Sequence, residues 1–452
     1  MMVRSIIGLL IICLLVTFGD QSAIADSQWK KKQQSLFEEI DLKPGEMITT
    51  ENLEKIDGLV PSAIADWVKK GLWQMKIGEF KYDISHQDEW INASKKNAGK
   101  YQLNEKKVIV EVKTKKPPLY IYGAPFPYLD IKNDPDGGAK FMFNYLLSLF
   151  RLETSRVLCA PEWIGKGGFE RQLETFTIRH FFWGRPNGAI PNPAKFRFKD
   201  IMNVISPYDM AGTNQLTLRR LDGTPDEVYV YIPAIRRVKR MSGANRSDPY
   251  MGCDMTVDDT WGFAGLMSSM KWTFLEEKVG LLCASEFIAD HPRKMIQTSD
   301  GTWRTQKNEV SAILGEEVEG WKGAKNAFMN VVWIPRRFYI LEGIPRDAYY
   351  NMGKLVLWID KNVHWCNFRT DFDRAKEYWK QSINLPNYCI WGNQRGMQTA
   401  QGQITIDEKM NHTTYTNAHG RRHGGMDAYT EYNDPKLNPK MFTLSRLRMW
   451  SK

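Results

Sequence analysis

Nine charged side chains of both signs lie within residues 236–259 and could do several kinds of chemistry. Arginine donates paired hydrogen bonds to phosphate or carboxylate, so the basic residues could bind an anionic head group. They could also keep an exposed strand edge from aggregating, or pair with the acidic residues, because buried charges need partners. The basic residues are Arg236, Arg237, Lys239, Arg240 and Arg246, and the acidic ones are Asp248, Asp254, Asp258 and Asp259.

The two signs follow each other closely, which favours internal pairing. We therefore interpret the four aspartates as a structural charge network. A pair between Arg246 and Asp248 would fix the loop between the two clusters. The five basic residues remain candidate contacts of a ligand.

Metal binding and catalysis are weaker interpretations of the same aspartates. Calcium takes six to eight oxygen ligands, but the spacing lacks the alternating acidic pattern and fixed glycine of an EF-hand loop. Asp258 and Asp259 could be read as the carboxylate pair of a glycoside hydrolase. Adjacent residues of a strand point to opposite faces, so these two could not face one substrate if they lie on a strand. We expect no catalytic residues, no metal and no cofactor.

A second candidate site lies at residues 411–429, where His419 and His423 are four residues apart and His412 and Asp427 are nearby. On a helix such a pair could bind zinc. The glycines of this stretch disfavour a helix, and no glutamate stands between the histidines as a metalloprotease motif requires. We predict a flexible surface loop.

The element that must position the charged residues begins at Val228. Residues 228–232 carry apolar side chains on both parities, which predicts a strand buried on both faces. Pro233 has no amide hydrogen and should end that strand. Tyr229 and Tyr231 share one face, so they are candidate ligand contacts together with Trp261, the alternative being ordinary core packing.

The N-terminus resembles a secretory signal. Arg4 precedes an apolar run, residues 5–18, which is too short to span a bilayer. Ala23 and Ala25 are small residues at the two positions that a signal peptidase reads, so residues 1–25 are expected to be removed. The mature chain keeps the net charge of +10. That charge suits an anionic partner such as lipid head groups, whereas scattered Lys and Arg argue against nucleic acid.

The five cysteines of the mature chain form no C-x-x-C pair, so we expect mostly free thiols with at most two disulfides. Residues 26–110 are predicted to form a helical arm and first strands, including a helix at 62–72 and strands around a polar insert at 85–106. A strongly apolar helix is expected at 141–152. From residue 169 onward the pattern is mostly β, with a turn inside 271–282 and a tight turn at 360–362. Strands joined by short turns predict an antiparallel sheet, so the fold class is α+β and mainly antiparallel β.

One long stretch carries a family resemblance: SPYDMAGTNQLTLRRLDG, then DEVYVYIPAIRRVKRMSGANRSDPYMGCDMTVDD. It resembles the bacterial family called domain of unknown function 1329, and GAPFP (123–127) and residues 336–361 extend the match. That family is similar to the periplasmic carrier and outer-membrane receptor proteins of lipoprotein sorting (LolA/LolB-like). The resemblance implies a large curved sheet, or half-barrel, over residues 111–452, covered by helices around an apolar cavity. Cys253 stands where the family pattern leads us to expect a serine.

The resemblance further implies a periplasmic carrier of a lipid, an acylated molecule or another hydrophobic ligand. Members are thought to work beside envelope exporters, so an exporter or an outer-membrane protein is the expected partner. We expect no enzyme activity and a location in the periplasm or at the periphery of the outer membrane. The alternative is a structural or assembly partner of an outer-membrane or exporter complex that carries no ligand.

Overall fold

The computed structural model describes residues 28–242, 246–306, 312–420, 422–424 and 427–449. The expected signal peptide, residues 1–25, lies outside the described residues. Among those described, no helix is both long enough and apolar enough to cross a membrane.

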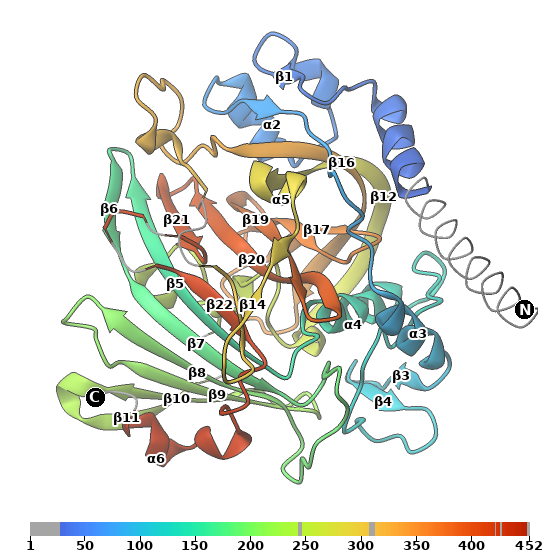
Figure 1. Ribbon diagram of the computed structural model, residues 1–452, viewed down its shortest axis with the longest axis vertical. Coiled ribbons are helices and arrows are strands. Elements are labelled where there is room, and N and C mark those ends of the chain that lie inside the picture. The colour runs from blue at the N-terminus through green and yellow to red at the C-terminus, as the bar shows by residue number, and fades with distance from the viewer. Residues whose placement is uncertain (1–27, 243–245, 307–311, 421, 425–426, 450–452) are drawn as a thin grey trace, which may run out of the picture.

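One large antiparallel sheet dominates the molecule, and the chain is α+β and mainly β (Figure 1). Each neighbouring pair along the sheet is antiparallel. In spatial order the strands are β12 (Met270–Ser285), β16 (Val331–Pro345), β17 (Lys354–Asp360), β18 (Cys366–Phe372), β19 (Tyr378–Trp391), β20 (Gln394–Asp407), β21 (His412–Asn417), β5 (Thr154–Gly165), β7 (Glu174–Phe181), β8 (Phe196–Ser206), β9 (Asn214–Arg220), β10 (Glu227–Ile232) and β11 (Arg237–Met241).

β5 joins the two halves of this sheet because it changes partners along its length. Its first half pairs with β7 and with β22 (Tyr429–Tyr432). Its second half pairs with β21 and with β6 (Gly168–Gln172). Three short strands lie nearby: β13 (Arg293–Lys294), β14 (Ile296–Gln297) and β15 (Trp303–Arg304).

The helix α4 (Gly137–Leu149) contacts β12 and β20. All but one of its residues are buried, because its apolar side chains surround the helix instead of forming a stripe. The apolar core extends from this helix across β12 and β16–β20 and into the N-terminal arm. The arm contains a helix at 28–40, β1 (Met47–Ile48), η1 (Leu53–Ile56), α2 (Ser62–Lys69), β2 (Met75–Lys76), α3 (Asp88–Lys96), β3 (Tyr101–Leu103) and β4 (Ile109–Glu111).

Several expected elements are present. The helices predicted at 62–72 and 141–152 are α2 and α4, with ends shifted by a few residues. The tight turn at 360–362 joins β17 to β18 and is held by the Asp360 carboxylate, which accepts hydrogen bonds from the amides of Asn362 and Val363.

Other expectations are wrong. Residues 271–282 contain no turn, since β12 runs straight through them and only a bulge between Phe274 and Glu276 interrupts its pairing. The polar insert at 85–106 contains α3 and β3, and the strands expected on either side of it shrink to two and three residues. The boundary at residue 110 stays a prediction, although the apolar residues of the arm join the core of the sheet.

Candidate ligand-binding cavity

A cavity of about 200 Å³ lies on the inner face of β5, β7, β8 and β9. Every second residue of each strand lines it, as strand geometry requires when one face is turned inward. β20, β21 and the residue after β21 close its far side, mostly with small side chains. The strand residues that line it are Ser155, Val157, Cys159, Pro161, Thr175, Thr177, Arg179, Phe198, Asp200, Met202, Gln215, Thr217, Arg219, Ala400, Gly402, Gln403 and Thr416, and Ala418 follows β21.

The loop 246–264 covers this cavity and contributes apolar side chains, among them Cys253, Met255 and Trp261. Trp261 has a positive φ of 53°, which costs energy for a bulky residue and must be held by its surroundings. Its amide donates to Oε1 of Gln403 at 3.0 Å, and its carbonyl accepts from the hydroxyl of Tyr145 on α4 at 2.6 Å. The indole is therefore fixed in the cavity wall.

One end of the cavity wall is charged. Arg219 donates two hydrogen bonds to the carboxylate of Asp226 at 2.8 and 2.7 Å, and Arg246 donates to the same carboxylate at 2.6 Å. Arg246 also binds Asp258 at 2.6 Å through Nε. Burial alone would raise the pKa of Asp226, but the two arginines outweigh it and hold the pKa at about 2.

The four aspartates of the sequence prediction have separate partners. Arg246 pairs with Asp258 and not with Asp248, whose carboxylate accepts from Nδ2 of Asn351 at 2.9 Å. Asp259 contacts Arg369 of β18 at 2.9 Å and Thr256, and Asp254 accepts from Thr414 of β21 at 2.7 Å. Asp259 and Asp254 tie the loop to β18 and β21, and Asp248 ties it to the segment between β16 and β17, whereas the Arg246–Asp258 pair lies within the loop. Asp258 and Asp259 lie in the short 3-10 helix η5 (Val257–Asp259), not on a strand.

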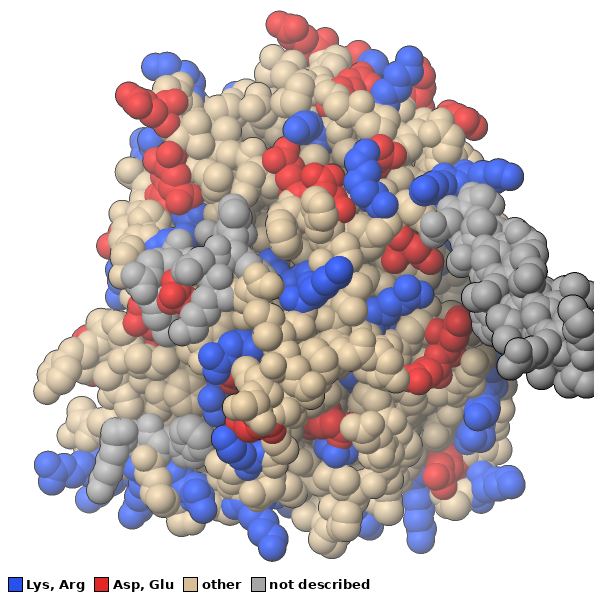
Figure 2. Space-filling model, viewed as in Figure 1, with Lys and Arg blue, Asp and Glu red and all other residues tan. Residues whose placement is uncertain are grey.

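The basic residues 236–240 lie outside the cavity. Arg237, Lys239 and Arg240 are exposed on β11, which pairs only with β10 among the described strands, and Arg236 is exposed in the turn before it. This placement agrees with the strand-edge interpretation, in which charge discourages pairing with another chain. Figure 2 shows Lys and Arg predominating along the lower margin of the molecule, where β10, β11 and α6 (Leu444–Leu447) lie in Figure 1.

Tyr229 and Tyr231 do not line the cavity, and β10 is not buried on both faces. Paired residues of antiparallel strands point to the same side, and Tyr229 pairs with Leu216, a residue of the outer face. Both tyrosines are half-buried there against the C-terminal segment that includes Leu447. β10 lies next to the last strand of this half of the sheet, and only Val228 in it is buried.

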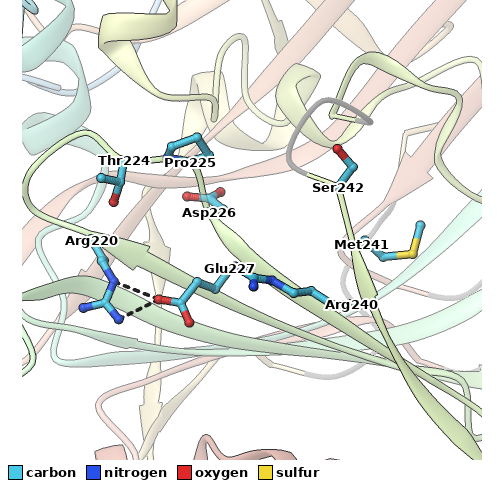
Figure 3. Close-up of a pocket in the computed structure, with 8 residues that line it drawn as sticks. All are labelled: Arg220, Thr224, Pro225, Asp226, Glu227, Arg240, Met241 and Ser242. Atoms are coloured by element: carbon cyan, nitrogen blue, oxygen red, sulfur yellow. Dashed lines mark hydrogen bonds and ion pairs between the residues drawn. The ribbon is translucent and has the colours of Figure 1, made fainter.

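A second hollow, of about 680 Å³, lies at the turn between β9 and β10 (Figure 3). Arg220 and Glu227 form an ion pair across it at 2.8 Å, and Arg240 extends along its side. Of the eight side chains that line it, only Pro225 and Met241 are apolar, and four are charged. A hydrophobic ligand would be poorly matched by this lining, so we place the candidate site in the first cavity.

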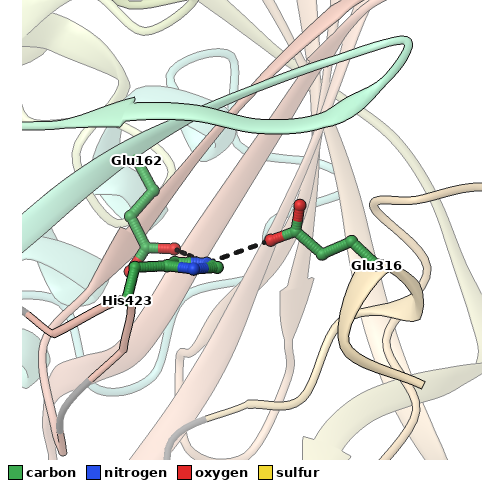
Figure 4. Close-up of side chains that lie close together, drawn as sticks. All are labelled: Glu162, Glu316 and His423. Atoms are coloured by element: carbon green, nitrogen blue, oxygen red, sulfur yellow. Dashed lines mark hydrogen bonds and ion pairs between the residues drawn. The ribbon is translucent and has the colours of Figure 1, made fainter. Parts of the chain in front are cut away.

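The histidines of residues 411–429 do not meet. His419 is buried and bonded to Asn387, whereas His412 binds Asp254. His423 lies close to Glu162 and Glu316 (Figure 4). Among the described residues, these three side chains are near enough to one another to bind a metal ion together.

Arg422 already supplies a positive charge to that group. Its guanidinium donates to Glu162 at 2.8 Å and to Glu316 at 3.2 Å. The arrangement is therefore an ion-pair network as it stands. Burial raises the pKa of Glu162 to about 7, against the opposing effect of Arg422.

The five cysteines of the expected mature chain are free thiols. Cys159 and Cys253 line the cavity, and burial raises the pKa of both. A protonated thiol is a poor nucleophile, so neither is activated for covalent chemistry.

Sequence reasoning missed the strand residues that form the cavity wall, above all Arg179, Phe198 and Asp200. The alternation in TFTIRHF predicted a strand there, whereas FRFKDIM was not predicted as a strand. In both segments each parity mixes polar and apolar side chains, so the sequence could not indicate which side chains face inward.

These observations define a mainly antiparallel α+β protein with a largely apolar cavity between its sheet and a covering loop. The chain belongs to the family described as "Protein of unknown function (DUF1329)", whose model matches residues 47–448.

No curated protein matches this chain. Among solved structures, a domain from Vibrio parahaemolyticus assigned provisionally to outer membrane lipoprotein sorting is 15% identical, with 70% of this chain and 100% of that one covered and a TM-score of 0.46. A DUF1329 family protein from Desulfovibrio piger is 15% identical, with 67% and 97% covered and a TM-score of 0.43. A LolA superfamily protein from Nitrosomonas europaea is 13% identical, with 68% and 98% covered and a TM-score of 0.40. The architecture described above rests on the strand pairings of this chain.

Proposed function

We propose that this protein is a periplasmic carrier that binds a lipid, an acylated molecule or another hydrophobic ligand in the cavity beneath loop 246–264. The observation that carries the proposal is the lining itself. Apolar atoms make up most of its surface, although about half of the lining side chains are polar, many of them threonines, and the arginines gather at one end.

Binding in this cavity would remove apolar ligand surface from water, which stabilises a complex by about 25 cal/mol per Å². Aliphatic, thioether and aromatic side chains such as Val157, Met202 and Trp261 offer contacts that do not depend on a particular head group. Release would then need a partner at the membrane, such as an exporter or an outer-membrane protein, that binds the ligand more tightly or opens the loop.

The proposed role is transport and not catalysis. The carboxylates at the charged end are each bound to an arginine, so none of them is free to approach a substrate as an acid or base. An aspartate pair acting on one substrate would need two carboxylates free to approach it, and Asp258 and Asp259 are bound to different arginines.

The test is native mass spectrometry of the mature protein purified from its own periplasm, followed by solvent extraction and identification of the extract. A stoichiometric hydrophobic molecule, retained on the folded protein and released on extraction, is the expected result. A clean apo mass together with no uptake of added lipids would overturn the carrier proposal and favour the assembly role.

A further inference from the structure

Arg179, on β7, lines the cavity and is only partly neutralised. Its Nε donates to Oδ2 of Asp200, the residue paired with it on β8, at 2.9 Å. Its two terminal nitrogens make no hydrogen bond or ion pair with any residue that the structure describes. The side chain is 16% exposed, and the cavity is the space that it lines.

The other two arginines of the cavity wall have partners for their terminal nitrogens. Arg219 binds Asp226 and the carbonyls of Ala264 and Gly265, and Arg246 binds Asp226 and Asp258. Arg179 is therefore the arginine whose paired donors are open to a ligand. Two parallel N–H groups on a planar guanidinium match the two oxygens of a carboxylate or a phosphate.

The charges around this end of the cavity leave positive charge in excess. Four arginines gather there, at positions 179, 197, 219 and 246, against three carboxylates, at positions 200, 226 and 258. Burial and the proximity of Arg219 lower the pKa of Arg197, as expected where a cation lacks a counter-ion. Burial also raises the pKa of Asp200, which disfavours the ionised form of the carboxylate bound to Arg179.

Aromatic rings lie between the charged end of the cavity and its more apolar part. The Arg179 guanidinium lies 4.5 Å from the ring centre of Phe198 and 5.5 Å from that of Phe150. Phe150 in turn lies 5.6 Å from Trp261. A ligand whose polar end binds Arg179 would thus place the rest of its atoms against aromatic and aliphatic side chains.

We infer that the ligand of this cavity is an anionic amphiphile, whose carboxylate or phosphate group binds the terminal nitrogens of Arg179 while its single slim chain lies along the apolar lining. This inference rests on the proposed carrier function and narrows its ligand class. The cavity has the volume of about seven water molecules, which suits one chain better than a bulky multi-chain lipid.

The experiment measures, by titration calorimetry on the delipidated mature protein, the affinities of palmitate, of palmityl alcohol, of lysophosphatidate and of inorganic phosphate. Palmitate and lysophosphatidate should bind about tenfold or more tightly than the alcohol, because charge-assisted hydrogen bonds exceed neutral ones. Arg179→Gln, which can still donate to Asp200, should remove this preference, so that palmitate and palmityl alcohol bind this variant with similar affinity. Arg179→Lys should keep part of it, and the control Arg240→Gln, on exposed β11, should keep all of it.

The outcomes separate the two proposals. Equal binding of palmitate and palmityl alcohol by the wild type would overturn the anion inference and leave the carrier function standing. Tight binding of inorganic phosphate alone would overturn it in favour of a small-anion site. If palmitate, palmityl alcohol and lysophosphatidate all fail to bind, the carrier function is overturned as well. If Arg179→Gln does not fold, the probe ratio in the wild type and in Arg179→Lys decides the question.

Discussion

Arg246 shows at the residue scale how the loop over the cavity is held. It is the shared partner of Asp226 and Asp258, whose side chains are 0% and 2% exposed. An intact buried ion pair adds little net stability, because the attraction between the charges is offset by the free energy of removing them from water. Removing one partner is costly, because it leaves an uncompensated buried charge. The loop is therefore more sensitive to loss of this one arginine than to loss of any exposed charge.

Arg246→Met should lower the free energy of unfolding by about 3–5 kcal/mol, measured by urea denaturation, because two buried carboxylates lose a counter-ion. Arg220→Met is the matched control: Arg220 also pairs with a carboxylate, Glu227, but is 37% exposed, so its loss should cost less than about 1 kcal/mol. Equal, small losses in the two variants would contradict the buried network.

Glu162 gives the protein a pH dependence of definite sign. Its pKa is raised by burial from 4.5 to about 7, so folding favours the protonated acid. That contribution to stability is complete below pH 4.5 and is lost as the pH rises through about 7.

Glu162→Gln keeps a neutral side chain at all these values of pH. The stability of the wild type relative to this variant should therefore fall between pH 5 and pH 8, by an amount on the order of 2–3 kcal/mol. Urea denaturation of both proteins across this range measures it. Parallel stability curves would show that Glu162 is ionised in the folded protein throughout.

At the scale of the element, the exposed charges of β11 protect the edge of the sheet, a role that requires no ligand. Lys239 of β11 lies opposite Val230 of β10, and Arg237 lies opposite Ile232. Apolar side chains of β10 therefore have basic neighbours on β11 at the end of this half of the sheet. An exposed apolar edge is a template for pairing with another chain.

Replacing Arg237 and Lys239 together by valine should therefore cause self-association, detected by light scattering as an increased mass at the same protein concentration. The charge-matched control replaces Lys95 and Lys96, which are exposed on α3 away from the sheet, and should remain unassociated. If both double variants behave alike, net charge and not edge protection controls association.

Three long strands, β5, β8 and β19, were not predicted individually. β5 and β19 each contain a proline, at 161 and 386, which argues against a central strand, whereas β8 contains none. β19 accommodates Pro386 with a bulge next to Leu385, and β5 changes partners near Pro161. The apolar helix α4 and the alternating strands were predictable because their patterns are local.

The candidate site was less predictable than the fold. Arg246 and Trp261 were expected to contact a ligand and do line the cavity, but Tyr229 and Tyr231 lie on the outer face. Which face of a strand turns inward depends on how the whole sheet curves, and the sequence of one strand does not contain that information. The position of Arg179 in the cavity wall follows only from the structure, which places β7, β8 and the loop around one cavity.

At the scale of the whole molecule, the proposed carrier function depends on whether the cavity accepts a ligand. Thr177 lies at the middle of the β7 wall and faces the cavity, so Thr177→Trp would fill it with an indole. Thr273, exposed on β12, offers the same substitution outside the cavity.

The decisive measurement is the uptake of a fluorescent fatty acid by delipidated wild-type protein, by Thr177→Trp and by Thr273→Trp, with circular dichroism to establish that all three are folded. We predict saturable binding at one site by the wild type and by Thr273→Trp, and binding weaker by about tenfold or more by Thr177→Trp. Equal binding by all three proteins, or no binding by any, would contradict the proposal that this protein carries its ligand in the cavity.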